Sequence, residues 1–280
     1  MPEVPLPDAF EWIRYPWGPA IRCRALAGVA DHCFTTRAPV LGAGPLTPGD
    51  GWHRVALAMG ISPRSIVRLR QVHGTHVVRL RRHETFPPGT PDWGVGDIAA
   101  SDHPGVAVCV KVADCVPVLL ADTRHGSVAA VHAGWRGTAA GAASAAIAAL
   151  VEEFGTDPCD LVAAIGPSIG PCCYRVGQDV RAAFEAAGKW DGSLGAWFSA
   201  EPAIEPLHGV PGSDPAASGG GPGVFLDTWT ANADQLRRSG VPPAQVHVSR
   251  LCTSCYRETF HSYRVDGERA GRMIGVIKKK

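Results

Sequence analysis

Two apolar segments separated by only four residues place the strongest constraint on the fold of this chain. Residues 116–122 and 127–133 are rich in residues that favour β-strands, and the linker between them, residues 123–126, ends in glycine. A short loop that contains glycine is typical of a β-hairpin. We therefore predict that these two segments pair as antiparallel strands.

The short loop also predicts the register of this hairpin. A loop of this length pairs Asp122 with Ser127. Pro117 then lies opposite His132, and Cys115 lies diagonally close to that histidine, within a slip of one or two residues. A thiolate and an imidazole at one end of a hairpin suit zinc or copper, whereas calcium and magnesium prefer oxygen ligands.

A metal at this point needs a third protein ligand, and His73 is the best candidate because it too interrupts an apolar run. Two ligands would hold zinc weakly, whereas three with an open fourth position make a catalytic site, whose bound water becomes acidic enough to supply hydroxide near neutral pH. Spacing alone leaves a second interpretation open. Cys115 would then be a small buried hydrophobic residue, and the histidines ordinary polar residues at strand ends.

The sequence motifs around these three residues resemble those of a known family. The motifs Q-V-H-G, A-D-C-x-P-V-L-L-x-D and A-A-V-H-A-G-W-R-G correspond to residues 71–74, 113–122 and 129–137, and further matches at residues 164–167 and 262–264 continue towards the C-terminus. In these motifs the chain resembles the laccase-domain proteins, which were first called multicopper polyphenol oxidases and were later recognised as purine nucleoside phosphorylases.

This resemblance implies a zinc ion held by His73, Cys115 and His132. It also implies a purine nucleoside phosphorylase that cleaves adenosine, inosine, guanosine or methylthioadenosine with phosphate, with an added adenosine deaminase activity. Copper is less expected than zinc. A multicopper oxidase needs further histidine clusters to reduce oxygen, and the other eight of the 11 histidines are scattered singly.

Four residues are candidates for catalysis and substrate binding. Asp97 or Asp114 would shuttle the proton to the leaving group. Asp114 adjoins the ligand Cys115, but neighbours in a strand point to opposite faces, so its expected role is to fix backbone or ligand geometry. Arg37 or Arg136 would be the charge partner of phosphate; the alternative is that Arg136 pairs with a carboxylate.

Two other enzyme classes remain open from the sequence. A cysteine hydrolase would use Cys115 as nucleophile and His132 as base, without a metal. A copper-dependent polyphenol oxidase would use His73, Cys115 and His132 as copper ligands. A non-enzymatic role as a binding partner is a third alternative. Metal content and nucleoside turnover distinguish these hypotheses.

The remaining pattern predicts an α+β (mixed α/β) fold, a single domain over residues 1–280 with mixed β-sheets flanked by helices. Helices are expected at residues 138–154, 178–187 and 228–239, and strands within residues 23–36, 65–80, 105–133, 160–165, 246–251 and 272–277. Residues of about 200–223 are rich in proline and glycine and lack a periodic apolar face, so we expect a mobile insertion there.

The composition excludes several partner classes. A net charge of +1 gives no electrostatic case for nucleic acid or membrane binding, and there is no apolar stretch long enough for a transmembrane span. The N-terminus lacks the features of a secretory signal, which predicts a cytoplasmic protein. The sequence does not distinguish a monomer from a homodimer.

The cysteines are expected to be reduced thiols, because nine is an odd number and no export signal is evident. Cys252 and Cys255 form a C-x-x-C pair. One such pair without a second is weak evidence for structural zinc, so free thiols are expected, with Cys255 incidental. Cys172 and Cys173 are expected to pack in a tight turn.

Overall fold

The computed structural model describes residues 4–41, 50–84, 93–190, 192–203 and 223–280. Within them the chain forms two six-stranded sheets and one small sheet. The first sheet has the strand order β1 (Phe10–Tyr15), β2 (Gly18–Cys23), β3 (Ala30–Thr35), β15 (Met273–Lys279), β7 (Ala107–Val112) and β4 (Ile66–Arg68). The second has the order β14 (Val246–Val248), β10 (Leu161–Ile165), β8 (Val116–Asp122), β9 (Val128–Ala133), β6 (Ile98–Ser101) and β5 (Val77–Leu80).

Both large sheets are mixed. In the first, β4 runs parallel to β7 while the other pairs are antiparallel. In the second, β14 is parallel to β10 and β5 is parallel to β6, and the central pairs are antiparallel. The prediction of a mixed α/β fold with mixed sheets flanked by helices is confirmed.

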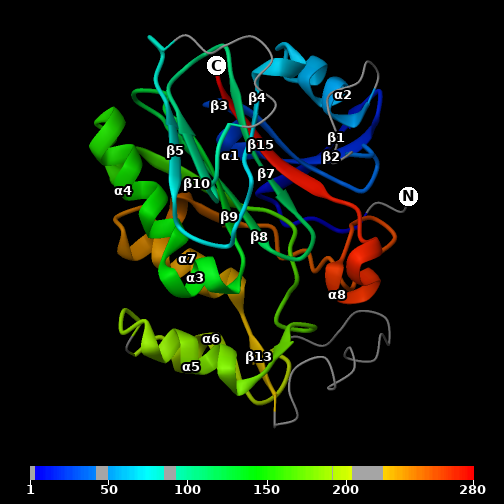
Figure 1. The fold of residues 1–280 in the computed structure, drawn as a ribbon, viewed down its shortest axis with the longest axis vertical. Helices are drawn as coiled ribbons and strands as arrows, with labels where there is room; N and C mark the ends of the chain where they lie inside the picture. Colours follow the sequence, from blue (N-terminus) through cyan, green and yellow to red (C-terminus); the bar gives the residue numbers. More distant parts are fainter. Residues whose placement is uncertain (1–3, 42–49, 85–92, 191, 204–222) are drawn as a thin grey trace.

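The second sheet is covered on both faces. All seven residues of β8 are buried, and alternate side chains enter different cores. Val118 and Leu120 pack towards the helices α4 (Ala142–Phe154) and α7 (Thr228–Arg238), whereas Leu119 and Ala121 pack against the first sheet. Figure 1 shows these helices on one side of the second sheet and the first sheet on the other.

The predicted hairpin is confirmed, with its register. β8 and β9 pair antiparallel, Pro117 faces His132, and the amide of Asp122 donates to the carbonyl oxygen of Ser127 at 2.9 Å. The register follows from the short loop, in which the Asp122 carboxylate accepts hydrogen bonds from the amides of Arg124 and His125.

The helix predicted at residues 138–154 differs in detail. The structure has two helices there, α3 (Trp135–Ala140) and α4, which meet at Gly141. Gly141 adopts φ 90°, a left-handed conformation that ends one helix and redirects the chain into the next. The prediction of one helix was therefore wrong, because the alanine-rich composition did not reveal this break.

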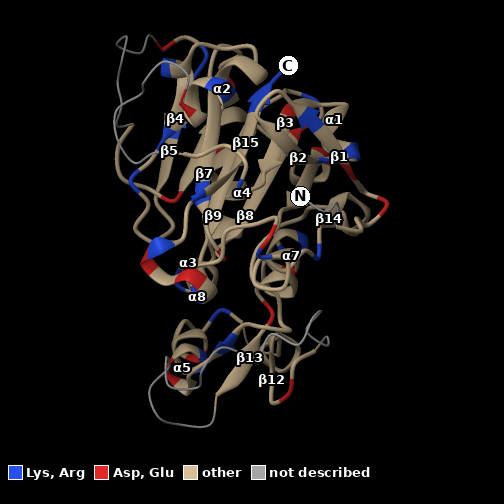
Figure 2. Ribbon diagram, turned by 90° about the vertical axis from the view of Figure 1, so that its right-hand side faces the viewer, with Lys and Arg blue, Asp and Glu red and all other residues tan. Residues whose placement is uncertain are grey.

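The remaining elements flank the two sheets. The helices are α1 (Arg24–Ala27), α2 (Gly51–Ala58), α5 (Gln178–Ala186), α6 (Leu194–Trp197) and α8 (Tyr263–Asp266), and the small sheet has the order β11 (Arg175–Val176), β13 (Val224–Leu226) and β12 (Phe198–Ser199). A separate aromatic core packs against the small sheet. It contains Phe184 of α5, Trp197 of α6 and Trp190, which lies between these two helices. This unit lies at one end of the molecule, and basic and acidic residues are interspersed along the ribbon (Figure 2).

Two further predictions can be compared with the structure only in part or differ from it in length. Most of the predicted insertion at about residues 200–223 lies outside the described residues. The strand predicted at residues 246–251 ends at Val248. None of the helices in the described parts of the chain combines the length and apolar character that a membrane span requires.

Candidate metal centre

The structure brings His73, Cys115 and His132 together. One donor atom from each lies within 4.8 Å of the others, and the two imidazole rings are 4.8 Å apart at 71°. His132 is buried, Cys115 is half-buried and His73 is exposed, so the group is open on the His73 side. Two nitrogens and one sulfur with an open side are the donors of a catalytic zinc site, and they suit copper as a second choice.

Each of the three side chains comes from a different segment. His132 lies on β9, next to its C-terminal end, and Cys115 directly precedes β8. The hairpin register therefore places these two residues side by side. His73 lies in the loop between β4 and β5 and adopts φ 63°, a conformation that is unusual for a residue other than glycine.

Asp97 holds this strained loop in place. Its carboxylate accepts hydrogen bonds from the amides of His73 at 2.8 Å and Gly74 at 2.7 Å, and from the amide of Val72 at 3.2 Å. The same carboxylate lies 2.8 Å from Nδ1 of His132. An Nδ1–H donated to Asp97 leaves Nε2 of His132 free to bind a metal.

The protonation states of the group are strongly coupled. Burial alone would raise the pKa of Asp97, but hydrogen bonds from His132 and from the amides of Gly74 and His73 hold it below its usual value. Burial also opposes the charged forms of Cys115 and His132. Nevertheless, hydrogen bonds from the two histidines lower the pKa of Cys115 to about 6, and those with Asp97 and Cys115 raise the pKa of His132 to about 9. The lowered pKa favours the thiolate form of Cys115, which is the form that binds metals.

Gly134 gives the three side chains room to converge. A Cβ atom at this position would lie 2.8 Å from Cδ2 of His73 and 3.0 Å from Sγ of Cys115. Only glycine therefore fits between the ligands without a shift. This glycine lies within the matched motif at residues 129–137, which was the sequence signal for its position.

The group borders two cavities, of which the second alone is also lined by His132. The first, of about 400 Å³, is lined by His73 and Cys115 together with Asp114, Arg136, Tyr174 and Arg264, among others. The second, of about 540 Å³, shares His73 and Cys115 and adds the basic residues Arg70, Lys111 and Arg272. A ligand in either cavity can therefore reach a metal held by these residues.

Asp114 lines the first cavity. It lies outside the regular strand that was assumed from the sequence, because β8 begins at Val116 and Asp114 adopts φ 82°. Its carboxylate accepts hydrogen bonds at 2.6 Å from the Thr253 hydroxyl and from the Arg264 amide. Burial raises the pKa of Asp114 above its usual value, although these hydrogen bonds oppose the shift. Asp97, by contrast, is fully buried and lines neither cavity.

The two arginines predicted to bind phosphate are separated. Arg136 lines the first cavity, and its guanidinium lies 4.3 Å from the ring centroid of Trp135, in a cation–π contact. Arg37 lines neither cavity and instead donates to the carbonyl oxygen of Arg257. Of the two predicted arginines, only Arg136 therefore brings its charge to the first cavity.

Tyr174 and Arg264 line the first cavity, and neither was predicted as a site residue. The Arg264 guanidinium lies 5.3 Å from the ring centroid of Tyr174 and donates to the carbonyl oxygen of Arg175 at 2.9 Å. Arg264 belongs to the matched motif at residues 262–264, but only the fold shows that it shares a cavity with Tyr174.

The family model described as multi-copper polyphenol oxidoreductase laccase matches residues 50–280. A purine nucleoside phosphorylase of Deinococcus radiodurans is 33% identical, with 92% of each chain covered. A purine nucleoside phosphorylase of Bacteroides thetaiotaomicron is 36% identical over 65% of this chain, and the match spans only 60% of that relative. Adenosine deaminase RL5, from an unknown prokaryotic organism, is 30% identical, with 81% of this chain and 79% of that one covered.

The fold is also found among solved structures. The crystal structure of YlmD from Geobacillus stearothermophilus superposes with a TM-score of 0.73 at 29% sequence identity, over 98% of this chain and 100% of that one. The mixed α/β arrangement of sheets and helices is therefore shared by a relative along nearly the whole chain.

Proposed function

The chain belongs to the multi-copper polyphenol oxidoreductase laccase family, and we propose that it is a zinc-dependent purine nucleoside phosphorylase that also deaminates adenosine. One observation carries the proposal. His73, Cys115 and His132 form a group of two nitrogen donors and one sulfur donor that is open on the His73 side and borders two cavities. The names of the relatives supply the substrate class, purine nucleosides with phosphate.

The donor set fits zinc. A thiolate and two imidazoles are ligands that zinc prefers, and His73 on the open side leaves a fourth position facing the cavities. Zinc bound there would supply a Lewis acid and an acidic bound water. Asp97 would fix the orientation of both histidines, since its carboxylate contacts the His73 loop and the His132 ring.

The first cavity is proposed to hold the nucleoside. Its volume of about 400 Å³ is in the range of small-molecule sites, and Tyr174 and Trp135 offer aromatic surface for a purine. Arg136 and Arg264 would hold phosphate through guanidinium–oxygen hydrogen bonds. Arg37 is not included in this proposal, because it lines neither cavity.

Asp114 is the proposed acid. It lines the cavity, and its raised pKa favours the protonated form that a proton donor needs. In phosphorolysis a phosphate oxygen bonds to C1′ of the ribose, the C1′–N9 bond breaks, and Asp114 would give its proton to the departing purine. In deamination a water oxygen adds to C6 of adenine, and Asp114 would carry the proton to the amine that leaves as ammonia.

A cysteine hydrolase is a second candidate, because Cys115 and His132 form the thiolate–imidazolium pair that such an enzyme uses. It leaves His73 without a role, and the relatives named above are phosphorylases and a deaminase. The copper oxidase is less supported still. The two candidate metal-binding groups within the described residues contain no histidines beyond His73 and His132.

The setting of this activity is also a proposal. We propose that residues 1–280 act as one domain, with an insertion at about residues 200–223, in the cytoplasm. The protein would work as a monomer or a homodimer. Its partners would be small molecules rather than nucleic acid or membrane, in agreement with its net charge of +1.

The test is chromatography of inosine and adenosine incubations with and without phosphate. Hypoxanthine and ribose 1-phosphate should form from inosine only when phosphate is present, and inosine should form from adenosine in both conditions. His73→Ala should lose both reactions. His83→Ala, which removes an exposed histidine that lines neither cavity, should keep them. Absence of any phosphate-dependent cleavage by the unaltered protein would overturn the proposal.

A further inference from the structure

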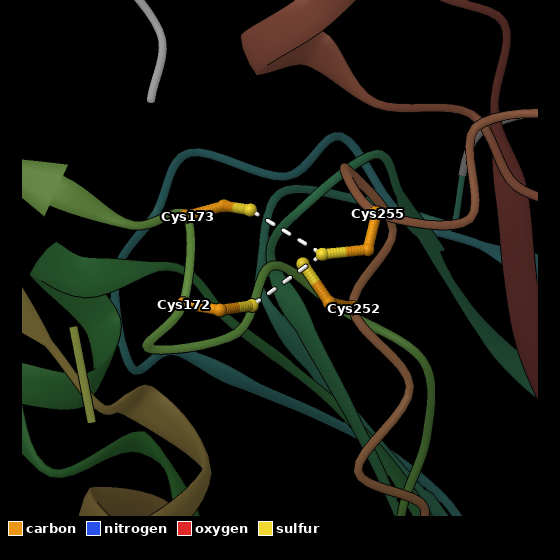
Figure 3. Close-up of side chains that lie close together, drawn as sticks. All are labelled: Cys172, Cys173, Cys252 and Cys255. Carbon is orange, nitrogen blue, oxygen red and sulfur yellow. Dashed lines mark hydrogen bonds between the residues drawn. The ribbon is translucent and has the colours of Figure 1, made fainter. Parts of the chain in front are cut away.

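Four cysteines outside the metal centre converge at one point in the fold. Two lie in the turn after β10 and two in the segment after β14, and their sulfur atoms point towards one another (Figure 3). We call this group the four-cysteine cluster; its members are Cys172, Cys173, Cys252 and Cys255. All four are buried, and none is in a disulfide bond. The cluster is separate from the site of the proposed reaction.

The sulfur atoms are arranged closely enough to share one ion. Sγ of Cys255 lies 3.6 Å from Sγ of Cys172 and 3.5 Å from Sγ of Cys173, and all four sulfurs are within 4.8 Å of one another. A tetrahedral zinc site with Zn–S bonds of about 2.3 Å has its sulfur atoms about 3.8 Å apart. An iron–sulfur cluster spreads its four cysteines over two or four iron atoms and needs wider spacing than a single ion does.

The backbone holds the two segments together independently of the sulfurs. Ser168 and Cys252 form a parallel bridge, in which the Ser168 amide donates to the Leu251 carbonyl at 3.1 Å and the Thr253 amide donates to the Ser168 carbonyl at 3.1 Å. The Trp229 indole N–H donates to the Ser168 hydroxyl at 2.7 Å. The cysteines are therefore held in place before any ion binds, which lowers the entropic cost of binding.

One backbone group already points at a sulfur. The Gly170 amide donates to Sγ of Cys252 at 3.3 Å. Gly170 has no room for a side chain, because a Cβ atom would lie 2.5 Å from the Trp229 ring. An N–H aimed at a ligand sulfur is the kind of contact that stabilises a metal-bound thiolate, and four thiolates around one Zn²⁺ carry a net charge of −2 that needs such donors.

From these observations we propose that the four-cysteine cluster is a second metal site, a closed tetrahedral zinc site with a structural role. A disulfide would join only two of the four sulfurs, and Cys255 has two equally near neighbours. One zinc ion bonds to all four, and the four thiol protons are released to solvent. A fully cysteine-ligated zinc has no open position, so it does not catalyse.

The position of the cluster indicates that the ion would stabilise segments next to the first cavity. The segments that it joins also contact Asp114: the Thr253 hydroxyl donates to its carboxylate at 2.6 Å, and the Ile169 amide donates to its carbonyl oxygen at 2.9 Å. Tyr174, next to Cys173, lines the first cavity. A zinc in the cluster would therefore fix the turn whose neighbours Ile169 and Tyr174 line the cavity, and the segment that hydrogen-bonds to Asp114.

Metal analysis by mass spectrometry tests the site in the whole protein. Protein purified without chelators should contain about two zinc ions per chain if both sites are filled, and Cys255→Ser should contain one fewer. Cys115→Ala should also lose one, but from the other site. Cys109→Ser is the matched control: this buried cysteine donates to the Val67 carbonyl outside the cluster, and its variant should keep both ions. Equal zinc in Cys255→Ser and the unaltered protein would overturn the proposal.

A second measurement applies even where Cys255→Ser fails to fold. Cys115→Ala, which keeps the four-cysteine cluster intact, should bind one Co²⁺ with the intense visible absorption of a tetrahedral tetrathiolate. The four thiols of the cluster should then react with a thiol reagent only after the metal is removed. No such absorption, or a disulfide among the four cysteines, would overturn the site. Iron in place of zinc in the protein as purified would overturn the assignment of the ion.

Discussion

The carboxylate of Asp97 lies 2.8 Å from Nδ1 of His132 and 2.8 Å from the backbone amide of His73. One buried residue thus orients two candidate ligands that come from different parts of the chain, one through its ring and one through its loop. Asp97 and Asp114 were the two candidates for the proton shuttle. These contacts support a positioning role for Asp97, and Asp114, which lines the first cavity, is the proposed acid.

We predict that Asp97→Asn weakens zinc binding at the His73, Cys115 and His132 site by about 10- to 100-fold. In the unaltered protein, backbone amides and the His132 ring donate to both carboxylate oxygens of Asp97. The side-chain amide of asparagine has only one acceptor oxygen, so some of these hydrogen bonds would be lost. Competition with a chromophoric chelator measures the affinity. Unchanged affinity in Asp97→Asn would show that Asp97 does not position the ligands.

Gly134→Ala should prevent zinc from binding at the same site while the protein still folds. The added methyl group would lie 2.8 Å from the His73 ring and 3.0 Å from the Cys115 sulfur. Gly195→Ala is the control, because its Cβ meets nothing within 4 Å. Zinc content and circular dichroism of both variants check this prediction; a Gly134→Ala protein with full zinc content would contradict it.

Asp114→Asn should lower kcat by about 10²- to 10⁴-fold, the usual contribution of a general acid. Its zinc content should not change, because Asp114 is not a proposed ligand: the amide keeps the shape of the carboxylate and accepts from Thr253, and only the Arg264 amide loses its acceptor. Asp97→Asn should differ from this, because its main effect should be a lower zinc affinity rather than a lower kcat of the zinc-loaded protein. Full kcat in Asp114→Asn would remove it from the proposed mechanism.

His32 should make the folded state sensitive to acid. Burial lowers the pKa of His32 from 6.5 to about 4, and its Nε2 accepts a hydrogen bond from the Cys23 amide, which requires an unprotonated nitrogen. Between these pH values the unfolded chain binds more protons than the folded one, so stability falls as the pH drops from 6.5 towards 4. The full loss is about 3 kcal/mol.

Chemical denaturation at several pH values measures this effect, with His32→Gln as the comparison. Glutamine keeps a donor and an acceptor but does not titrate. The difference in unfolding free energy between His32→Gln and the unaltered protein should therefore change in favour of the variant as the pH falls through that window. A difference that is independent of pH would exclude His32 as the source.

The sequence predicted the hairpin and the contact between Cys115 and His132, because a short loop and a two-residue period determine which residues face each other. The position of His73 does not follow from local rules, since its loop is held by Asp97, which directly precedes β6 and is distant in the sequence. The family motifs pointed to it instead. The left-handed conformation of Asp114 could not be predicted either, because the pattern gave no sign that the residues before β8 leave the strand conformation.

The four-cysteine cluster shows the same limit. Each cysteine pair has an ordinary interpretation by itself, a tight turn for Cys172 and Cys173 and free thiols for Cys252 and Cys255. Their approach depends on the parallel pairing of β10 with β14, a contact between segments distant in the sequence. Local spacing carries no information on that pairing.

The central claim is that zinc at His73, Cys115 and His132 supports phosphate-dependent cleavage of purine nucleosides. The most direct test is the rate of inosine phosphorolysis by chelator-treated protein as zinc is returned. We predict that the metal-free protein is inactive, that zinc restores the rate, and that Cys115→Ala is not restored at any zinc concentration. Full phosphate-dependent turnover by protein shown to lack metal would contradict the account.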